Sequence, residues 1–137
     1  MNIHFVGYLK TFVKQEWELL KKDHNVTTFD LEVHAASFHQ IPKFLILTLF
    51  DWKKIYNSDA VWIWVADYPA IPFIILAKIF KKPIIVNVSG FEVFAAPEIG
   101  YGNQLNPVRG AAYRWILRHA TRTIVMSNAY KKIVNIL

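Results

Sequence analysis

The sequence contains no cysteine, and this removes several classes of chemistry at once. A chain without thiols has no disulfides, no thiolate zinc site and no cysteine nucleophile. Histidine occurs five times, but never at the H-x-x-H or H-E-x-x-H spacing that is typical of metal sites. The chain also lacks a G-x-G-x-x-G fingerprint, a G-K-[ST] phosphate loop and a G-x-S-x-G elbow. We therefore expect no bound metal, no classical dinucleotide or P-loop site and no hydrolase triad.

Charged residues are also scarce, at 19% of 137 residues, whereas 54% are hydrophobic and 15% are aromatic. This balance excludes a disordered chain, and the length suits a single domain over residues 1–137 with its own core. Asp51, Asp67 and several prolines interrupt the apolar runs before the roughly 18 residues that a membrane span requires. The N-terminus has no basic segment typical of a signal peptide. The expected location is the cytoplasm, with peripheral contact to the inner face of the cell membrane as an extension.

The centre of the chain carries the clearest pattern. Val61–Val65 is an apolar run rich in β-branched and aromatic residues, which is typical of a strand buried on both faces. Ala70–Phe80 is apolar and of helical length, and it is followed by two lysines and Pro83, which suit the end of a helix. Ile84–Val88 reads as a second buried strand. These three segments predict a right-handed βαβ unit with parallel strands.

Further elements flank this unit on both sides. Periodicity and turn residues predict strands at Ile3–Val6, Asn25–Phe29 and Arg122–Met126, and helices at Val13–Lys22, 42–56 and 107–120, with a last helix capped by Ser127 or Asn128. Residues 31–40 and 94–106 read as loops. In the helix over 42–56, the spacing of Leu45, Leu49 and Trp52 predicts a buried stripe. The fold class is therefore α/β: a doubly wound, mainly parallel five-stranded Rossmann-like sheet with helices on both faces and the order 2-1-3-4-5.

Ligands of such sheets bind beyond the carboxyl ends of the strands, so the residues that follow each strand are the candidate binding residues. They are Gly7, Tyr8, Asp67, Tyr68, Ser89, Gly90, Phe91 and Glu92. Alternatives remain open for three of them. Gly7 either serves a tight turn or lets a ligand approach the backbone; Asp67 either caps the next helix or faces the crevice. Glu92 either lines the site with the Ser89 hydroxyl or lies in solvent.

A net charge of +6 favours anionic partners: nucleic acid, acidic lipid or phosphorylated small molecules. The densest basic cluster consists of Arg109, Arg114, Arg118 and Arg122 together with Trp115. A basic helical face with a tryptophan suits contact with anionic lipid or phosphate, although an ordinary solvated face has the same composition. Nucleic acid is the least favoured partner, because the chain contains no recognised nucleic-acid-binding module.

The order of elements resembles a known family. Lys82-Pro83-Ile84-Ile85-Val86 leads into Val88-Ser89-Gly90-Phe91-Glu92, and Arg118–Ser127 forms a helix end followed by a strand that ends in serine. This pattern is similar to the N-terminal domain of retaining glycosyltransferases of the GT-B fold, the large family that includes mannosyl- and glucosyltransferases. The likeness covers nearly all 137 residues, although each motif alone has low specificity.

The resemblance implies metal-independent transfer of a sugar from a nucleotide-sugar to a lipid or polysaccharide acceptor, which this half would bind. It implies that the donor is held by a C-terminal domain with a pair of glutamates, a partner that this sequence does not contain, so that this chain alone should be inactive. Two residues depart from the family pattern: Gly7 is followed by Tyr8 rather than glycine, and Ser89 stands where many members have histidine. The catalytic residues are therefore unknown, and Ser89, Gly90 and Glu92 are expected to bind. The alternative function is a non-catalytic α/β binding module, or a partner subunit of a split enzyme.

Overall fold

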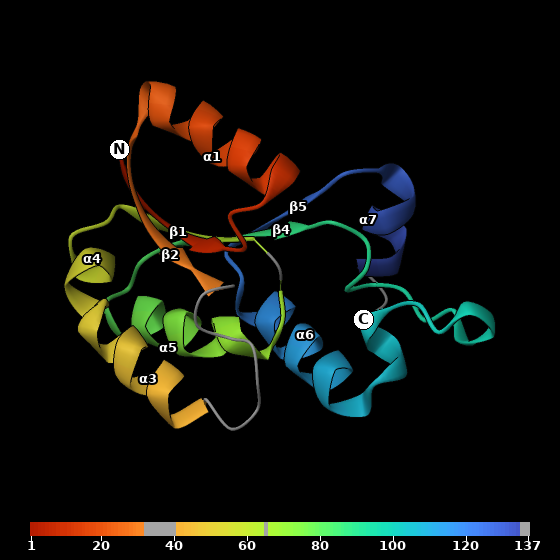
Figure 1. The fold of residues 1–137 in the computed structure, drawn as a ribbon. Helices are drawn as coiled ribbons and strands as arrows, with labels where there is room; N and C mark the ends of the chain where they lie inside the picture. Colours follow the sequence, from red (N-terminus) through yellow and green to blue (C-terminus); the bar gives the residue numbers. More distant parts are fainter. Residues whose placement is uncertain (32–40, 65, 135–137) are drawn as a thin grey trace.

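Five parallel strands form one sheet in the computed structural model, which describes residues 1–31, 41–64 and 66–134 (Figure 1). The strands are β1 (Asn2–Gly7), β2 (Asn25–Asp30), β3 (Ala60–Trp64), β4 (Ile84–Val88) and β5 (Arg122–Val125). Their spatial order is β2-β1-β3-β4-β5, and every neighbouring pair is parallel. The predicted Rossmann-like α/β class and the strand order are therefore confirmed.

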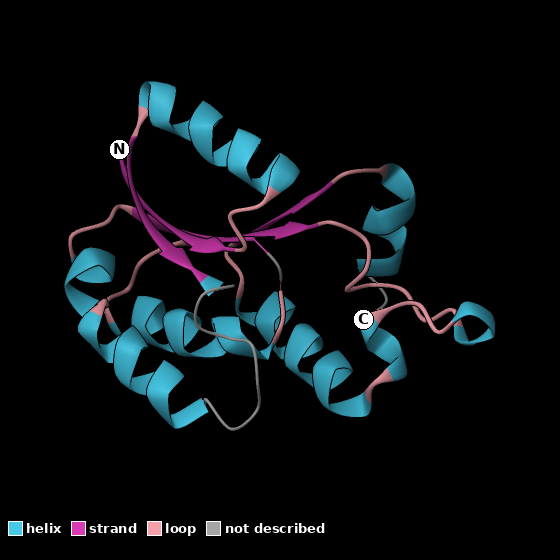
Figure 2. Ribbon diagram, in the orientation of Figure 1, coloured by secondary structure: helices cyan, strands magenta, loops and turns pink. Residues whose placement is uncertain are grey.

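Helices cover both faces of this sheet (Figure 2). Helix α1 (Thr11–Asp23) lies on one face, where Val13, Trp17 and Leu20 pack with Phe5 and Trp64, as the sequence spacing predicts. The opposite face carries α5 (Ile71–Ile79) and α6 (Pro107–His119). The core on that side is larger, because the inward residues of all five strands contribute to it or pack against it. Because successive side chains of a strand point to opposite faces of the sheet, the apolar residues of the strands are divided between two core layers.

Helix α5 ends where the lysines and proline of the sequence predict. Lys81 adopts a left-handed conformation, with φ of 54°, and the Lys82 N–H donates to the Ala77 carbonyl at 2.8 Å. This is the bond that closes a helix C-terminus when the chain turns away. A short 3₁₀ turn, η2 (Tyr68–Ala70), leads into the helix and carries Pro69. The predicted βαβ unit is therefore confirmed, although its helix is slightly shorter than the predicted Ala70–Phe80.

The helix predicted over 42–56 is wrong in two respects. It divides into α3 (Ile41–Phe50) and α4 (Trp52–Tyr56), with the break at Asp51. The stripe expected to be buried faces outward instead: Leu45, Leu49 and Trp52 are 46%, 60% and 41% exposed. The residues that face inward are Thr48, Asp51 and Ile55. Thr48 directly precedes Leu49 in the chain, and Asp51 directly precedes Trp52. The cause is that α3 is apolar on nearly every side, so the sequence pattern does not fix which side faces the core.

The C-terminal third follows the predicted order. After β4, residues 94–106 form two 3₁₀ turns, η3 (Pro97–Ile99) and η4 (Asn103–Leu105), where the sequence indicated only a loop. Helix α7 (Asn128–Val134) begins after Ser127, whose Oγ accepts from the Tyr130 N–H at 3.3 Å. The predicted loop over 31–40 falls almost wholly outside the described residues. Among the helices that are described, none has the length and apolarity to cross a bilayer.

Candidate functional site

The strand order places a crevice at the carboxyl ends of β1 and β3. Strand β1 is followed in the chain by β2, which lies on one side of this central pair, and β3 is followed by β4, which lies on the other. A divergence of this kind is the switch point at which open α/β sheets bind ligands. Gly7 and Tyr8 lie at the end of β1, Asp67 and Tyr68 follow β3, and Ser89 follows β4 at the same edge. The fold therefore brings these predicted residues to one edge of the sheet.

Gly7 is required by packing between neighbouring strands. A Cβ built on Gly7 would lie 2.8 Å from the Trp64 Cβ and 3.2 Å from the Phe5 ring. Its φ is not in the left-handed region, so the close approach of β3, rather than a tight turn, explains the glycine. A ligand-facing role for the backbone at Gly7 stays a prediction.

The turn after β4 is built around a buried carboxylate. Both Glu92 oxygens accept from the Ser89 Oγ, at 2.8 and 3.0 Å, and one also accepts from the Gly90 N–H at 3.1 Å. Glu92 is buried, so the alternative that placed it in solvent is wrong. Gly90 has a φ of +122°, and a Cβ there would lie 2.7 Å from the Tyr130 hydroxyl oxygen. Glu92 therefore shapes the turn from inside, and Ser89, which donates to it, keeps lone pairs for a ligand hydroxyl.

Neutralising Glu92 should weaken the domain. We expect Glu92→Gln to lower the free energy of unfolding by about 2 kcal/mol, since hydrogen bonds to an ionised group contribute roughly 1.5–3 kcal/mol. One amide oxygen cannot accept every bond that the two carboxylate oxygens accept. Urea unfolding measures the difference. Glu98→Gln is the matched control, because Glu98 is exposed, and an equal effect of the two substitutions would contradict this account.

Phe91 and Tyr113 complete the surroundings of this turn. Phe91 is partly exposed, and its ring meets the Tyr101 ring edge-on with centroids 5.0 Å apart. Tyr113 is buried on α6, and its hydroxyl has no hydrogen-bond partner among the residues that the structure describes. Burial, together with the charge of Glu92, raises the pKa of Tyr113 well above its usual value of 10.0. The Tyr113 hydroxyl therefore stays neutral in the interior.

Asp67, Tyr68 and Arg109 contact one another beyond the end of β3. Asp67 Oδ1 accepts from the Tyr68 N–H at 2.7 Å, so this carboxylate caps η2. Its other oxygen lies 3.8 Å from Arg109 Nε. Burial raises the pKa of Asp67, while the Tyr68 N–H and Arg109 act in the opposite direction. Asp67 therefore caps the 3₁₀ turn that precedes α5, rather than α5 itself, and it pairs with Arg109. A ligand-facing role for Asp67 stays a prediction.

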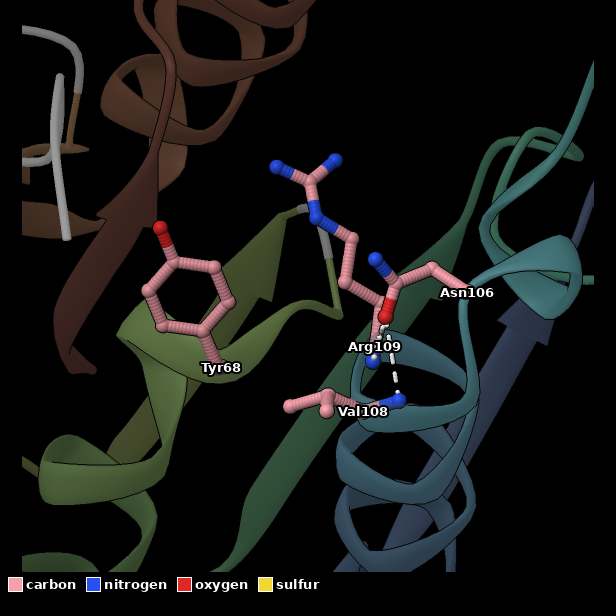
Figure 3. A pocket seen from close by; sticks show the side chains of 4 residues that line it. All are labelled: Tyr68, Asn106, Val108 and Arg109. Carbon is pink, nitrogen blue, oxygen red and sulfur yellow. Dashed lines mark hydrogen bonds between the residues drawn. The ribbon is translucent and has the colours of Figure 1, made fainter.

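Arg109 lies in the first turn of α6, and its side chain extends between Tyr68 and Asn106 (Figure 3). Its guanidinium carbon lies 6.0 Å from the Tyr68 ring centroid, and its Nη1 donates to the Asn103 Oδ1 at 3.4 Å. Asn106 caps α6 by accepting from the Val108 and Arg109 N–H groups at 3.0 and 3.2 Å. A cavity of about 210 Å³ is lined by Tyr68, Asn106, Val108 and Arg109. An aromatic ring, a cation and an amide thus line one cavity, a combination that suits a sugar or a phosphate-bearing ligand.

The other members of the basic cluster have different surroundings. Arg114 donates to the Gln104 Oε1 at 2.9 Å, and Gln104 in turn donates to the Glu92 carbonyl, so Arg114 supports the loop. Trp115 stacks on His119 with ring centroids 4.1 Å apart. Arg118 is exposed, and it lies about 13 Å along the helix from Arg109 at a rise of 1.5 Å per residue. Arg122 donates to the Thr121 carbonyl at the start of β5. Within this cluster, Arg109 is the arginine that lines the cavity described above.

Sequence reasoning missed three polar residues near the crevice. Asn106 had a usable signal, because asparagine directly before a proline is typical of a helix start. Asn103 and Glu16 had none. Glu16, on α1, accepts from the Trp64 indole N–H and from Asn87 Nδ2, the latter at 2.9 and 3.1 Å. This carboxylate therefore ties α1 to β3 and β4 through partners 48 and 71 positions away.

Comparison with known proteins adds no family assignment: neither protein-family models nor curated proteins gave a match to this chain. The groups of three or more His, Cys, Asp or Glu side chains that hold metals are absent from the described parts of the chain.

Proposed function

We propose that this domain is the acceptor-binding half of a retaining glycosyltransferase with a GT-B fold. The reaction would move a sugar from a nucleotide-sugar to a lipid or polysaccharide acceptor. The observation that carries the proposal is the Tyr68–Arg109 cavity at the carboxyl edge of the sheet. The resemblance of the element order to the N-terminal half of these enzymes supports it further.

The chemistry of the cavity fits such an acceptor. The Tyr68 ring offers a flat apolar face for the C–H side of a sugar, and Arg109 offers charged N–H donors for a hydroxyl or a phosphate. Asp67 holds the Arg109 side chain from the interior, which reduces the conformational entropy that Arg109 loses when a ligand binds. Ser89 at the neighbouring turn adds a hydroxyl. These residues are proposed to bind and orient the acceptor, and we assign no catalytic residue among them.

The proposal requires a partner. In the family, the nucleotide-sugar is held by a separate donor-binding domain with a pair of glutamates, so this half alone would hold the acceptor without transferring sugar to it. Adding such a donor-binding domain and a labelled nucleotide-sugar tests this part. Transfer of label only in the presence of both halves supports a glycosyltransferase, while acceptor binding without transfer favours the non-catalytic binding module.

Acceptor binding itself can be tested by NMR on the ¹⁵N-labelled chain. The ligands are a water-soluble short-chain prenyl phosphate monosaccharide, the prenyl phosphate without sugar, and the free sugar. We expect amide shifts at Tyr68, Ser89 and Arg109, and about tenfold weaker binding for Arg109→Ala, since a charged hydrogen bond contributes roughly 1.5–3 kcal/mol. Arg118→Ala is the matched control, because Arg118 is exposed on the same helix. Shifts confined to other residues, or equal losses in the two variants, would overturn the assignment.

A further inference from the structure

Helices α3 and α5 expose a continuous apolar surface on the face of the sheet opposite α1. They lie side by side in Figure 1, and a groove of about 410 Å³ runs between them. Leu45, Leu49, Ile75 and Ile79 line this groove and are each 46–64% exposed. Phe50, at the end of α3, is 79% exposed. We call this the α3–α5 surface; large exposed apolar patches of this kind mark interaction sites.

Lysines gather at one end of the α3–α5 surface. Residues 45–56 and 71–82 contain five lysines and a single acidic residue: Lys53, Lys54, Lys78, Lys81, Lys82 and Asp51. Asp51 is buried and paired with Lys54, so these two charges offset each other, and the net positive charge comes from Lys53, Lys78, Lys81 and Lys82. The ammonium nitrogens of Lys53 and Lys82 lie 5.9 and 5.7 Å from the ring centroids of Trp52 and Tyr56. An apolar surface is therefore bordered by partly exposed aromatic rings and by cations.

From this arrangement we infer that the α3–α5 surface docks on an anionic lipid bilayer. A bilayer interface offers acyl chains to the apolar residues and phosphate groups to the lysines, and Trp and Tyr favour the boundary between the two. A second copy of the chain is a poorer occupant, because residues 45–56 and 71–82 contain no acidic residue other than the buried Asp51 and so offer no carboxylate to the lysines of another copy. The charge pattern thus selects acidic lipid as the partner.

This surface differs from the basic cluster on α6. Arg109 and Arg114 are engaged with Asp67, Asn103 and Gln104, and Trp115 packs against the core, whereas the α3–α5 surface has its apolar side chains exposed. Docking through α3 and α5 leaves the cavity beside Tyr68 outside the lipid-facing residues. The inference therefore goes beyond the proposed glycosyl transfer, and neither depends on the other.

Co-sedimentation with vesicles tests the inference. We expect the chain to bind phosphatidylcholine vesicles that contain phosphatidylglycerol, to bind pure phosphatidylcholine vesicles much less, and to dissociate as salt rises. The triple variant Lys53→Gln, Lys78→Gln, Lys81→Gln should bind about a hundredfold more weakly, at roughly fivefold per lysine. The double variant Leu49→Ser, Ile79→Ser should bind the vesicles at least about tenfold more weakly, because the apolar side chains that it removes would otherwise be buried away from water on docking.

Substitutions of the same types on other elements serve as controls for the α3–α5 variants. Leu19→Ser removes an exposed leucine from α1, and Lys14→Gln, Lys22→Gln, Lys132→Gln remove three exposed lysines elsewhere. All of these positions are at the surface, so every variant should fold, which circular dichroism confirms. If the matched variants lose as much binding as the α3–α5 variants, or if no preference for phosphatidylglycerol appears, the inference is wrong.

Two further outcomes would also overturn it. One is loss of binding in Arg114→Gln, Arg118→Gln while the triple lysine variant binds like the unmodified chain, which would move the contact to α6. The other is a dimer, seen by sedimentation equilibrium, that Leu49→Ser dissociates, which would make a second copy the occupant. Failure of vesicle binding leaves the acceptor shifts at Tyr68 and Arg109 unaffected, so the two proposals fail separately.

Discussion

Lowering the pH from 7 to 4 is expected to reduce the free energy of unfolding by about 3 kcal/mol through the buried imidazole of His4. His4 lies on β1, fully buried, with Nδ1 3.0 Å from the Thr27 Oγ1 and Nε2 3.4 Å from an Asp51 oxygen. Burial lowers the pKa of His4 from 6.5 to about 4, against the opposing charge of Asp51 and with a lesser contribution from Lys54. The imidazole is therefore neutral in the folded protein at pH 7.

The sign of the effect follows from where the proton binds. Between pH 6.5 and 4 the unfolded chain protonates His4 while the folded chain does not, so stability is fully present above pH 6.5 and falls as the pH approaches 4. Urea unfolding at both pH values measures the loss. His4→Gln serves as the control, since it keeps a polar group but does not titrate, and its loss should be smaller by about 3 kcal/mol. Asp67, whose pKa is raised, acts in the opposite direction but equally in both proteins. An unchanged pH dependence in His4→Gln would contradict this account.

The His4–Asp51 contact also explains where sequence reasoning failed in the fold. Strand order could be predicted because right-handed βαβ connections leave few arrangements for a parallel sheet. The phase of α3 could not, because Leu45, Ile46, Leu47, Leu49 and Phe50 offer apolar residues on most sides of the helix. The side that faces inward carries Thr48 and leads to Asp51, a partner of a histidine far away in the chain. A helical pattern holds no information about a contact at that range.

For the candidate site, too, the sequence predicts some features and not others. Placing Tyr68 and Ser89 at one edge required only the direction of the strands, so the sequence was sufficient. The inward orientation of Glu92 is local, since its carboxylate accepts from Ser89 and Gly90. The pairing of Arg109 with Asp67, together with its bond to Asn103, depends on how the loop over 94–106 folds back. That loop has no periodicity, and it is held partly by backbone bonds, such as those from the Asn103 and Gln104 N–H groups to the Phe91 and Phe94 carbonyls, which carry no sequence signature. The position of Tyr68 and Ser89 at this edge was thus predictable, whereas Asn106 and the partners of Arg109 were not.

Gly102→Ala is expected to cost at least about 3 kcal/mol of unfolding free energy and to weaken the site at the same time. Gly102 has a φ of +110°, and a Cβ there would overlap with the Phe94 carbonyl oxygen. The strained conformation alone costs of order 1–3 kcal/mol, and a clash with backbone cannot be relieved by a side-chain rotation. Urea unfolding measures the stability. Gly100→Ala is the matched control: its φ of +62° is left-handed too, but nothing lies within 4 Å of the added Cβ, so about 1 kcal/mol is expected.

The same substitution tests whether loop geometry supports the proposed binding site. Asn103 and Gln104 follow Gly102 directly, and their N–H groups donate to the Phe91 and Phe94 carbonyls at 2.9 and 3.2 Å. If the methyl group added at position 102 pushes this backbone away from Phe94, Asn103 can no longer accept from Arg109. We therefore expect Gly102→Ala to reduce acceptor binding about as much as Arg109→Ala does, while Gly100→Ala binds normally. Equal ligand binding by the two glycine variants would show that the loop does not hold Arg109 in place.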